Sequence, residues 1–136
     1  MRILAIDYGG RRTGLAVSDE LGITAQGQET VVVNDEQELP GAVARVAGSL
    51  GAERIVIGLP LNMDGTESKM SVKVRAFGGL LALEIGLPVV FWDERLTSMQ
   101  AHRVMRELGM KTRGNKHAVD RISATLLLQE YLKTLT

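Results

Sequence analysis

The sequence contains no cysteine, so disulfides and thiolate metal sites are excluded. This absence fits the reducing cytoplasm. No apolar run approaches the roughly 20 residues of a membrane span, and the first residues show no cleavable signal pattern. Internal repeats, linkers and low-complexity tracts are also missing. We therefore expect a cytoplasmic protein that does not use a membrane as partner.

The net charge is also zero, from 16 basic and 16 acidic side chains, so only the distribution of charge is informative. Segment 95–121 carries seven basic side chains against two acids. The seven are Arg95, Arg103, Arg106, Lys111, Arg113, Lys116 and Arg121. This local excess suits a surface that binds a polyanion, although such a run can also be a solvated face.

The length and composition predict a single globular domain. The chain has 136 residues, of which 45% are hydrophobic, and this is enough to bury a core. We assign one domain to residues 1–136.

The first 19 residues predict a hairpin. The apolar run 3–6 is long enough for a buried strand, ends abruptly at Asp7, and is followed after a turn by a second apolar run at 15–17. Glycines at 9, 10 and 14 permit the tight turn between them. Asp7 is thus placed at the carboxyl end of the first strand, as a functional carboxylate or as a cap of the turn.

The remaining pattern predicts an α/β fold. Strands are expected at 24–33, 54–59 and 88–92, and helices at 36–50, 66–85, from Thr97 or Ser98 to about 108, and at 118–134. Asp64 followed by Glu67 resembles a capping box for the second helix. This order gives a five-stranded mixed sheet in which strands 1, 2 and 3 are antiparallel, strands 1, 4 and 5 are parallel, and helices cover both faces.

Three acids are expected at one edge of this sheet. Ligands of open sheets bind beyond the carboxyl ends of strands, where Asp7 and Glu94 fall. On the last helix, Asp120 shares a face with three core-type residues at 124, 127 and 131. Alone, Asp120 could be a favourable partner of the helix dipole. Together, three carboxylates suit one or two Mg²⁺ or Mn²⁺ ions, which in pairs promote phosphodiester hydrolysis.

Four segments make the resemblance to a known family specific: 7–19 (DYGGRRTGLAVSD), 56–65 (VIGLPLNMDG), 93–98 (DERLTS) and 120–132 (DRISATLLLQEYL). In this order and spacing they resemble the YqgF/RuvX family. The resemblance implies a ribonuclease H-like fold, related to the RuvC Holliday junction resolvases. It also implies a nuclease that trims the precursor of small-subunit ribosomal RNA at its 5′ end, or a junction resolvase. Matched by motif, the catalytic and metal-binding acids are Asp7, Glu94 and Asp120.

Two positions depart from the pattern of RuvC-type enzymes. The strand at 54–59 ends in Gly58 and Leu59, with no acid where the resolvases keep their second one. Glu94, on the next strand, must then supply that carboxylate. Ser123 stands where the resolvases carry a further Asp. We expect the metal geometry to differ accordingly.

The neighbouring acids Asp93 and Glu94 are expected to play different roles. Adjacent side chains of a strand point to opposite faces, so only one of them can face the metal site directly. Glu94 is longer and reaches farther toward the first strand. Asp93 is expected to turn back onto the backbone or to hold Arg95.

Several residues are candidates for binding nucleic acid. Glycines near Asp7 would let a phosphate approach the backbone, basic side chains would contact phosphates, and Asn62 would touch substrate. A turn explains the glycines equally well, and a loop or cap role is open for Asn62 and Asp64. The candidates are Gly9, Gly10, Arg11, Arg12, Asn62, Arg95, Lys111, Arg113 and Lys116. Phe91 and Trp92 are predicted to be core residues, with base stacking as the alternative.

The leading hypothesis is a metal-dependent nuclease acting on structured RNA or DNA, in ribosome biogenesis or in DNA recombination. A resolvase would need two active sites and therefore a homodimer. The spacing of Asp7, Gly9 and Gly14 also occurs in ATP-binding domains of the actin and sugar-kinase type, but these need two such domains. A non-catalytic nucleic-acid-binding module is the third possibility.

Overall fold

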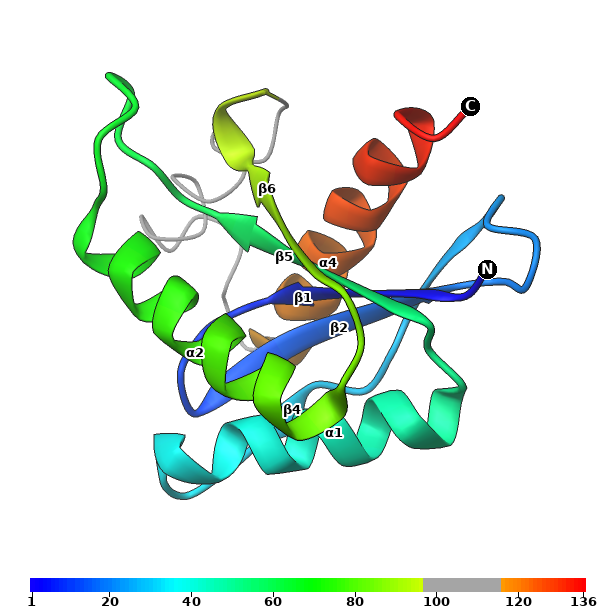
Figure 1. The fold of residues 1–136 in the computed structure, drawn as a ribbon, viewed down its shortest axis with the longest axis horizontal. Coiled ribbons are helices and arrows are strands. Elements are labelled where there is room, and N and C mark those ends of the chain that lie inside the picture. Colours follow the sequence, from blue (N-terminus) through cyan, green and yellow to red (C-terminus); the bar gives the residue numbers. More distant parts are fainter. Residues whose placement is uncertain (97–115) are drawn as a thin grey trace.

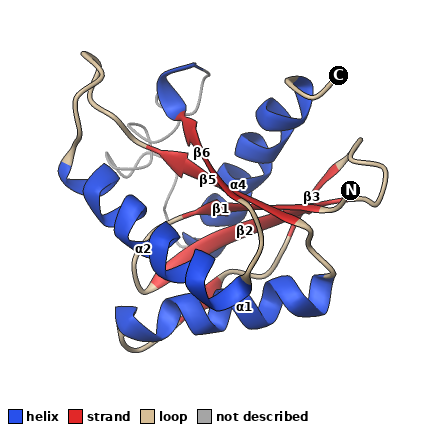
Figure 2. Ribbon diagram, in the orientation of Figure 1, coloured by secondary structure: helices blue, strands red, loops and turns tan. Residues whose placement is uncertain are grey.

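A computed structural model describes residues 1–96 and 116–136, with the backbone alone for 116–120. The helix expected after Thr97 and most of the basic segment 109–117 lie outside the described residues. The elements form a mixed sheet between helices (Figures 1 and 2). No helix in the described ranges is long and apolar enough to cross a membrane.

The central sheet follows the order β3-β2-β1-β5-β6. Its strands are β1 (Ile3–Asp7), β2 (Arg12–Ser18), β3 (Ala25–Gly27), β5 (Arg54–Leu59) and β6 (Val89–Asp93), and β4 (Val31–Val32) pairs with the start of β2. Strands β1, β2 and β3 are antiparallel, whereas β1, β5 and β6 are parallel, as predicted. The carboxyl ends of the three parallel strands therefore meet at one edge, called the carboxyl edge below.

The expected third strand, 24–33, is wrong as a single element, and the described sheet has six strands instead of five. The chain leaves the ladder between β3 and β4, where Arg121 of α4 contacts it. The Cγ atom of Arg121 occupies the space beside Gly27 where a side chain would lie, and its Nε donates to the Gln28 carbonyl at 3.2 Å. This contact is long-range in sequence, so a local strand pattern cannot indicate it.

Helices cover both faces of the sheet. On one face lie α1 (Leu39–Leu50) and α2 (Lys69–Ile85), and on the other lies α4 (Lys116–Lys133) (Figure 1). Leu4 and Ile6 of β1 pack in the core under α1 and α2, whereas Ile3 and Ala5 pack in the core under α4. Because β1 is buried on both faces, the alternation of side chains along it decides which core each residue joins.

Two helix starts differ from the sequence prediction. Residues Glu36–Glu38 form a separate 3₁₀ turn before α1, capped by the Asp35 side chain, which accepts from the Gln37 amide at 2.9 Å. The capping box assigned to Asp64 is wrong. Ser68 caps α2 by a reciprocal pair of hydrogen bonds with Ser71, and Ser68 also donates to the Pro60 carbonyl at 2.6 Å. Several residues in this stretch can cap a helix. Ser68, the residue that does so, also forms a hydrogen bond to Pro60, which directly follows β5.

Two adjacent glycines of α2 provide a test of this packing. A Cβ on Gly78 would lie 2.5 Å from Phe91 Cζ and 3.3 Å from Ile57 Cδ1, whereas a Cβ on Gly79 would meet nothing within 4 Å. We expect Gly78→Ala to destabilise the fold by about 1–3 kcal/mol through overpacking. Gly79→Ala should stabilise it by about 0.5–1 kcal/mol, because alanine favours a helix interior. Urea unfolding of both variants tests this, and shifts in the same direction would contradict the packing described.

Candidate active site

Asp7 ends β1 at the carboxyl edge and is buried, with 3% of its surface exposed. It pairs with Gly14 of β2 across the hairpin. Ala5 and Ile3, two and four residues earlier, belong to the core under α4. The alternation of the strand therefore assigns Asp7 to the face that α4 covers.

Glu94 follows β6 directly, in the 3₁₀ turn Glu94–Leu96, and none of its surface is exposed. Its carboxyl group lies over β5. A Cβ built on Gly58 would be 2.6 Å from Glu94 Oε1 and 3.4 Å from its Cδ. Val56, two residues before Gly58, packs in the core under α4, so this position is on the face to which Asp7 is assigned.

The register brings this carboxyl group close to the end of β1. Ile6 pairs with Ile57 in the parallel ladder, and continuing the register by one residue sets Asp7 beside Gly58. Glu94 therefore extends from β6 across β5 toward the strand that carries Asp7. Its length gives it the reach that the sequence indicated.

The third acid, Asp120, lies in α4 one helical turn before Ala124. Ala124, Leu127 and Tyr131 all pack in the core against the sheet, so the predicted inward face of this helix is confirmed. Ser123, at the position where a further Asp was noted in resolvases, is buried. The described side chains contain no group of three potential metal ligands, and the side chain of Asp120 is not among them.

Asp93 faces away from this site and holds Arg95, as predicted. Its Oδ1 accepts from the Arg95 backbone amide at 2.9 Å, and its Oδ2 accepts from Nη2 at 2.7 Å. The hydrogen bonds from Arg95 hold the pKa of Asp93 below its usual value. Arg95 Nη1 also donates to the Met63 carbonyl at 3.3 Å, which ties the loop after β5 to the end of β6. The guanidinium proposed to contact phosphate is therefore already paired with a carboxylate.

Asn62 and Asp64 shape the loop that follows β5. The Asn62 side-chain amide donates to Thr66 Oγ1 at 3.0 Å and to the Glu67 carbonyl at 3.1 Å. Asp64 accepts from the hydroxyl and the amide of Thr66, and these hydrogen bonds lower its pKa. Both side chains thus have the loop role that the sequence left open.

The glycine turn after Asp7 needs glycine for geometric reasons. Gly10 has a φ of 76°, and the Glu36 carboxylate occupies the space beside it. A Cβ on Gly9 would collide with the Arg12 carbonyl oxygen. Arg11 beside this turn is exposed, and Arg12 is half-buried. The turn alone accounts for these glycines, and Arg11 is open to a ligand.

Phe91 and Trp92 are confirmed as residues packed against the core. Phe91 packs under α2, and Trp92 makes an edge-to-face contact with Tyr131 at a centroid separation of 5.8 Å. Within the described residues, the buried Trp92 Nε1 has no hydrogen-bond acceptor.

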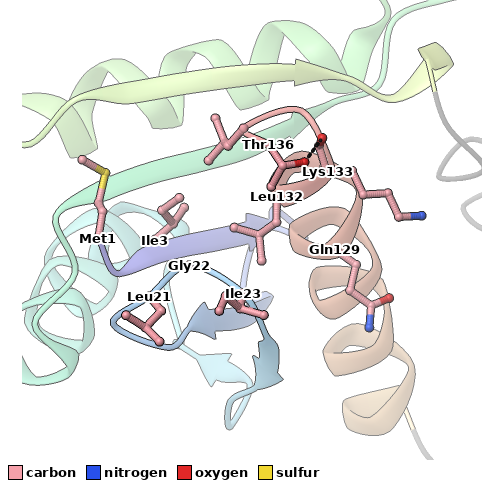
Figure 3. Close-up of a pocket in the computed structure, with 10 residues that line it drawn as sticks. Met1, Ile3, Leu21, Gly22, Ile23, Gln129, Leu132, Lys133 and Thr136 are labelled. Atoms are coloured by element: carbon pink, nitrogen blue, oxygen red, sulfur yellow. Dashed lines mark hydrogen bonds between the residues drawn. The ribbon is translucent and has the colours of Figure 1, made fainter.

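A groove of about 500 Å³ opens at the amino end of β1 (Figure 3). It is formed by Met1 and Ile3, the turn after β2, and the end of α4 around Leu132. Because it opens at the amino end of β1, it does not belong to the candidate active site.

Comparison with known proteins gives the family. A family model described as "RuvX: Holliday junction resolvase" matches residues 1–134. The chain belongs to the RuvX family. A member from Koribacter versatilis is 47% identical, over 97% of this chain and 86% of that protein, and one from Agathobacter rectalis is 44% identical, over 100% and 97%. Both are named "Putative pre-16S rRNA nuclease".

Solved structures confirm the ribonuclease H-like fold of this RuvX member. T. thermophilus RuvC in complex with a Holliday junction substrate matches with a TM-score of 0.61 and 19% identity, over 99% of this chain and 95% of that one. The fowlpox virus resolvase in complex with Holliday junction DNA matches with a TM-score of 0.58 and 14% identity, over 99% of both chains. At these identities the likeness concerns the fold.

Sequence reasoning missed the part played by Gly58. The sequence shows that no acid is present there, but it does not show that the carboxyl group of Glu94 fills the space beside Gly58. A signal was present, because glycine inside a strand often marks a close approach by another group.

Proposed function

We propose that this RuvX protein is a divalent-metal-dependent nuclease that processes the 5′ end of the small-subunit ribosomal RNA precursor. The observation that carries the proposal is the buried Glu94 carboxyl group lying over Gly58, beside the strand that ends in Asp7. The names of the 47% and 44% identical relatives support this substrate. Work on a ribosomal RNA precursor would place the protein in the cytoplasm.

The donor set fits a hard cation. Asp7 and Glu94 are buried carboxylates, and Asp120 would add a third from α4. Oxygen-only ligands suit Mg²⁺ or Mn²⁺, and buried carboxylates are stabilised by a cation. We assign Asp7, Glu94 and Asp120 as the residues that hold one or two such ions.

A divalent ion held by these carboxylates would supply a water nucleophile at neutral pH and would stabilise the charge on the leaving oxygen. The chain's own contribution is to fix the direction of the carboxylates and to bind the substrate backbone. Asp7 is held by the sheet at a strand end, and Glu94 is held between β6 and Gly58. Attack in line would leave a 5′-phosphate and a 3′-hydroxyl.

Cleavage of Holliday junctions is the second candidate function. The description of the matching family model, "RuvX: Holliday junction resolvase", favours it. This activity would require a homodimer, since a junction is cut on two strands. A module that binds nucleic acid without cleaving it is the remaining alternative.

A substrate panel tests the proposed function. The purified protein is incubated with Mn²⁺ and labelled precursor RNA, single strands, duplexes and four-way junctions. We expect cleavage of the precursor RNA at its 5′ leader to be fastest. Faster symmetric cleavage of the junction would favour the resolvase, and tight binding without any cleavage would leave only the binding module.

The basic segment 109–117 provides a test of substrate binding. Replacing Lys111, Arg113 and Lys116 together with Ala should weaken binding and reduce the slope of log affinity against log salt by up to about three contacts. Unfolding stability should change by no more than about 0.5 kcal/mol.

The control for this test removes three basic side chains elsewhere. Arg2 and Lys133 lie near the amino end of β1, and Arg45 is exposed on α1. Their joint replacement by Ala lowers the net charge equally. If both triple variants change the salt slope by the same amount, the basic segment does not form the nucleic-acid surface.

A further inference from the structure

We propose that Gly58 is a positioning residue of the metal site, whose missing side chain admits the Glu94 carboxyl group over β5. This inference rests on the proposed function, because it takes Asp7 and Glu94 as metal ligands. It assigns a role to a residue that carries no chemistry itself.

The backbone does not require glycine at this position. Gly58 is not among the residues with positive φ, and it lies inside β5. It pairs in register with Trp92, between the pairs Ile57–Phe91 and Leu59–Asp93. Glycine weakens a strand interior, so the local conformation would favour another residue. The reason for glycine must therefore be space.

The space beside Gly58 is filled by the end of one side chain. A Cβ there would lie 2.6 Å from Glu94 Oε1, 3.4 Å from Cδ and 3.5 Å from Cγ. Real Cβ atoms essentially never approach another atom as closely as 2.6 Å. Since Glu94 is fully buried, the carboxyl group cannot move aside into solvent without leaving the site. An added methyl group would thus displace the carboxylate.

The backbone around Glu94 is also held. Asp93, on one side of it, accepts hydrogen bonds from the amide and the guanidinium of Arg95, on the other side. Arg95 in turn donates to the Met63 carbonyl. These hydrogen bonds fix the turn from which Glu94 extends. A clash at Gly58 is therefore relieved by moving the carboxyl group and not the backbone.

The same geometry allows the carboxylate to be supplied either from β5, at position 58, or from the end of β6, at position 94. A side chain at position 58 projects into the volume that the Glu94 carboxyl group occupies. If Glu94 is shortened to Ala, an Asp at position 58 can place a carboxylate there from β5. Positions 58 and 94 would then be alternative sources of the same metal ligand.

Mn²⁺ titration calorimetry on five proteins tests this: the wild type, Gly58→Ala, Glu94→Ala, Gly58→Ala with Glu94→Ala, and Gly58→Asp with Glu94→Ala. We expect Gly58→Ala to weaken Mn²⁺ binding about tenfold or more in the wild-type background, as residues that orient ligands do. Glu94→Ala should remove Mn²⁺ binding, with or without Gly58→Ala. Gly58→Asp should restore measurable Mn²⁺ binding to the Glu94→Ala protein.

Thermal unfolding in EDTA separates this inference from the proposed function. Gly58→Ala should lower Tm when Glu94 is present and not when it is Ala, whether or not the protein binds metal. An equal effect of Gly58→Ala on Tm in both backgrounds, or an unchanged Mn²⁺ affinity of Gly58→Ala, would overturn the inference. A coupled effect on Tm in a wild type that binds no Mn²⁺ would keep the packing and overturn the proposed metal site.

Discussion

Asp7→Asn is expected to abolish cleavage while leaving the fold intact. Asp7 is buried at the end of β1 on the α4 face of the sheet, where it is proposed to hold the cation. Losing one charged ligand should cost several kcal/mol in the transition state, which is about a 10³-fold loss of rate. Without metal, the variant should be as stable as the wild type or slightly more so, because a like charge is removed.

The measurement is a single-turnover cleavage rate, accompanied by urea unfolding in EDTA. Glu20→Gln is the matched control, because the Glu20 carboxylate is exposed and pairs with Arg2 at 3.6 Å on the surface. Surface pairs of this kind contribute little to stability, so the control should keep full activity. If Asp7→Asn loses activity only because it unfolds, then Asp7 has a structural role and the proposed site is wrong.

The variants Glu94→Gln and Asp93→Asn change adjacent residues but are expected to have different effects. The first should affect metal binding, and the second should affect the position of the loop after β5. Glu94 lies over Gly58 on the face assigned to Asp7, whereas Asp93 binds Arg95. We expect Glu94→Gln to remove divalent binding and cleavage together, with a loss of about 10³-fold in rate. Asp93→Asn should keep Mn²⁺ affinity within about threefold. It should reduce activity by displacing the loop after β5, because Arg95, which donates to the Met63 carbonyl, is held less firmly.

Mn²⁺ affinity and single-turnover rate, measured for both variants, decide between the two carboxylates. The Asn variant retains an oxygen that can accept from the Arg95 amide, so its fold should persist. If Asp93→Asn loses the metal and Glu94→Gln keeps it, the assignment of the ligand is reversed.

Local patterns were sufficient for the pairing of the main strands and for the places of Asp7 and Glu94 at strand ends. The apolar run that stops at Asp7 indicated where the first strand ends. The alternation of side chains along a strand indicated that Asp93 and Glu94 face opposite sides. The inward face of α4 followed likewise from the spacing of Ala124, Leu127 and Tyr131. Such short-range rules need no knowledge of the rest of the fold.

Features that depend on distant contacts were not predictable. The break between β3 and β4 involves Arg121 of α4, and Ser68 at the start of α2 also bonds to Pro60. The role of Gly58 depends on a side chain 36 positions later in the sequence, as numbered from Gly58 to Glu94. In each case the sequence offered several acceptable local choices, and packing between elements selected one.

The most direct test of the central claim is an end-group analysis of cleaved precursor RNA, made with Mn²⁺ and with EDTA. If the acids hold a cation that activates water, cleavage requires Mn²⁺ and leaves a 5′-phosphate and a 3′-hydroxyl. Cleavage that persists in EDTA and leaves a 2′,3′-cyclic phosphate would contradict the account, because the RNA's own 2′-hydroxyl would then be the nucleophile.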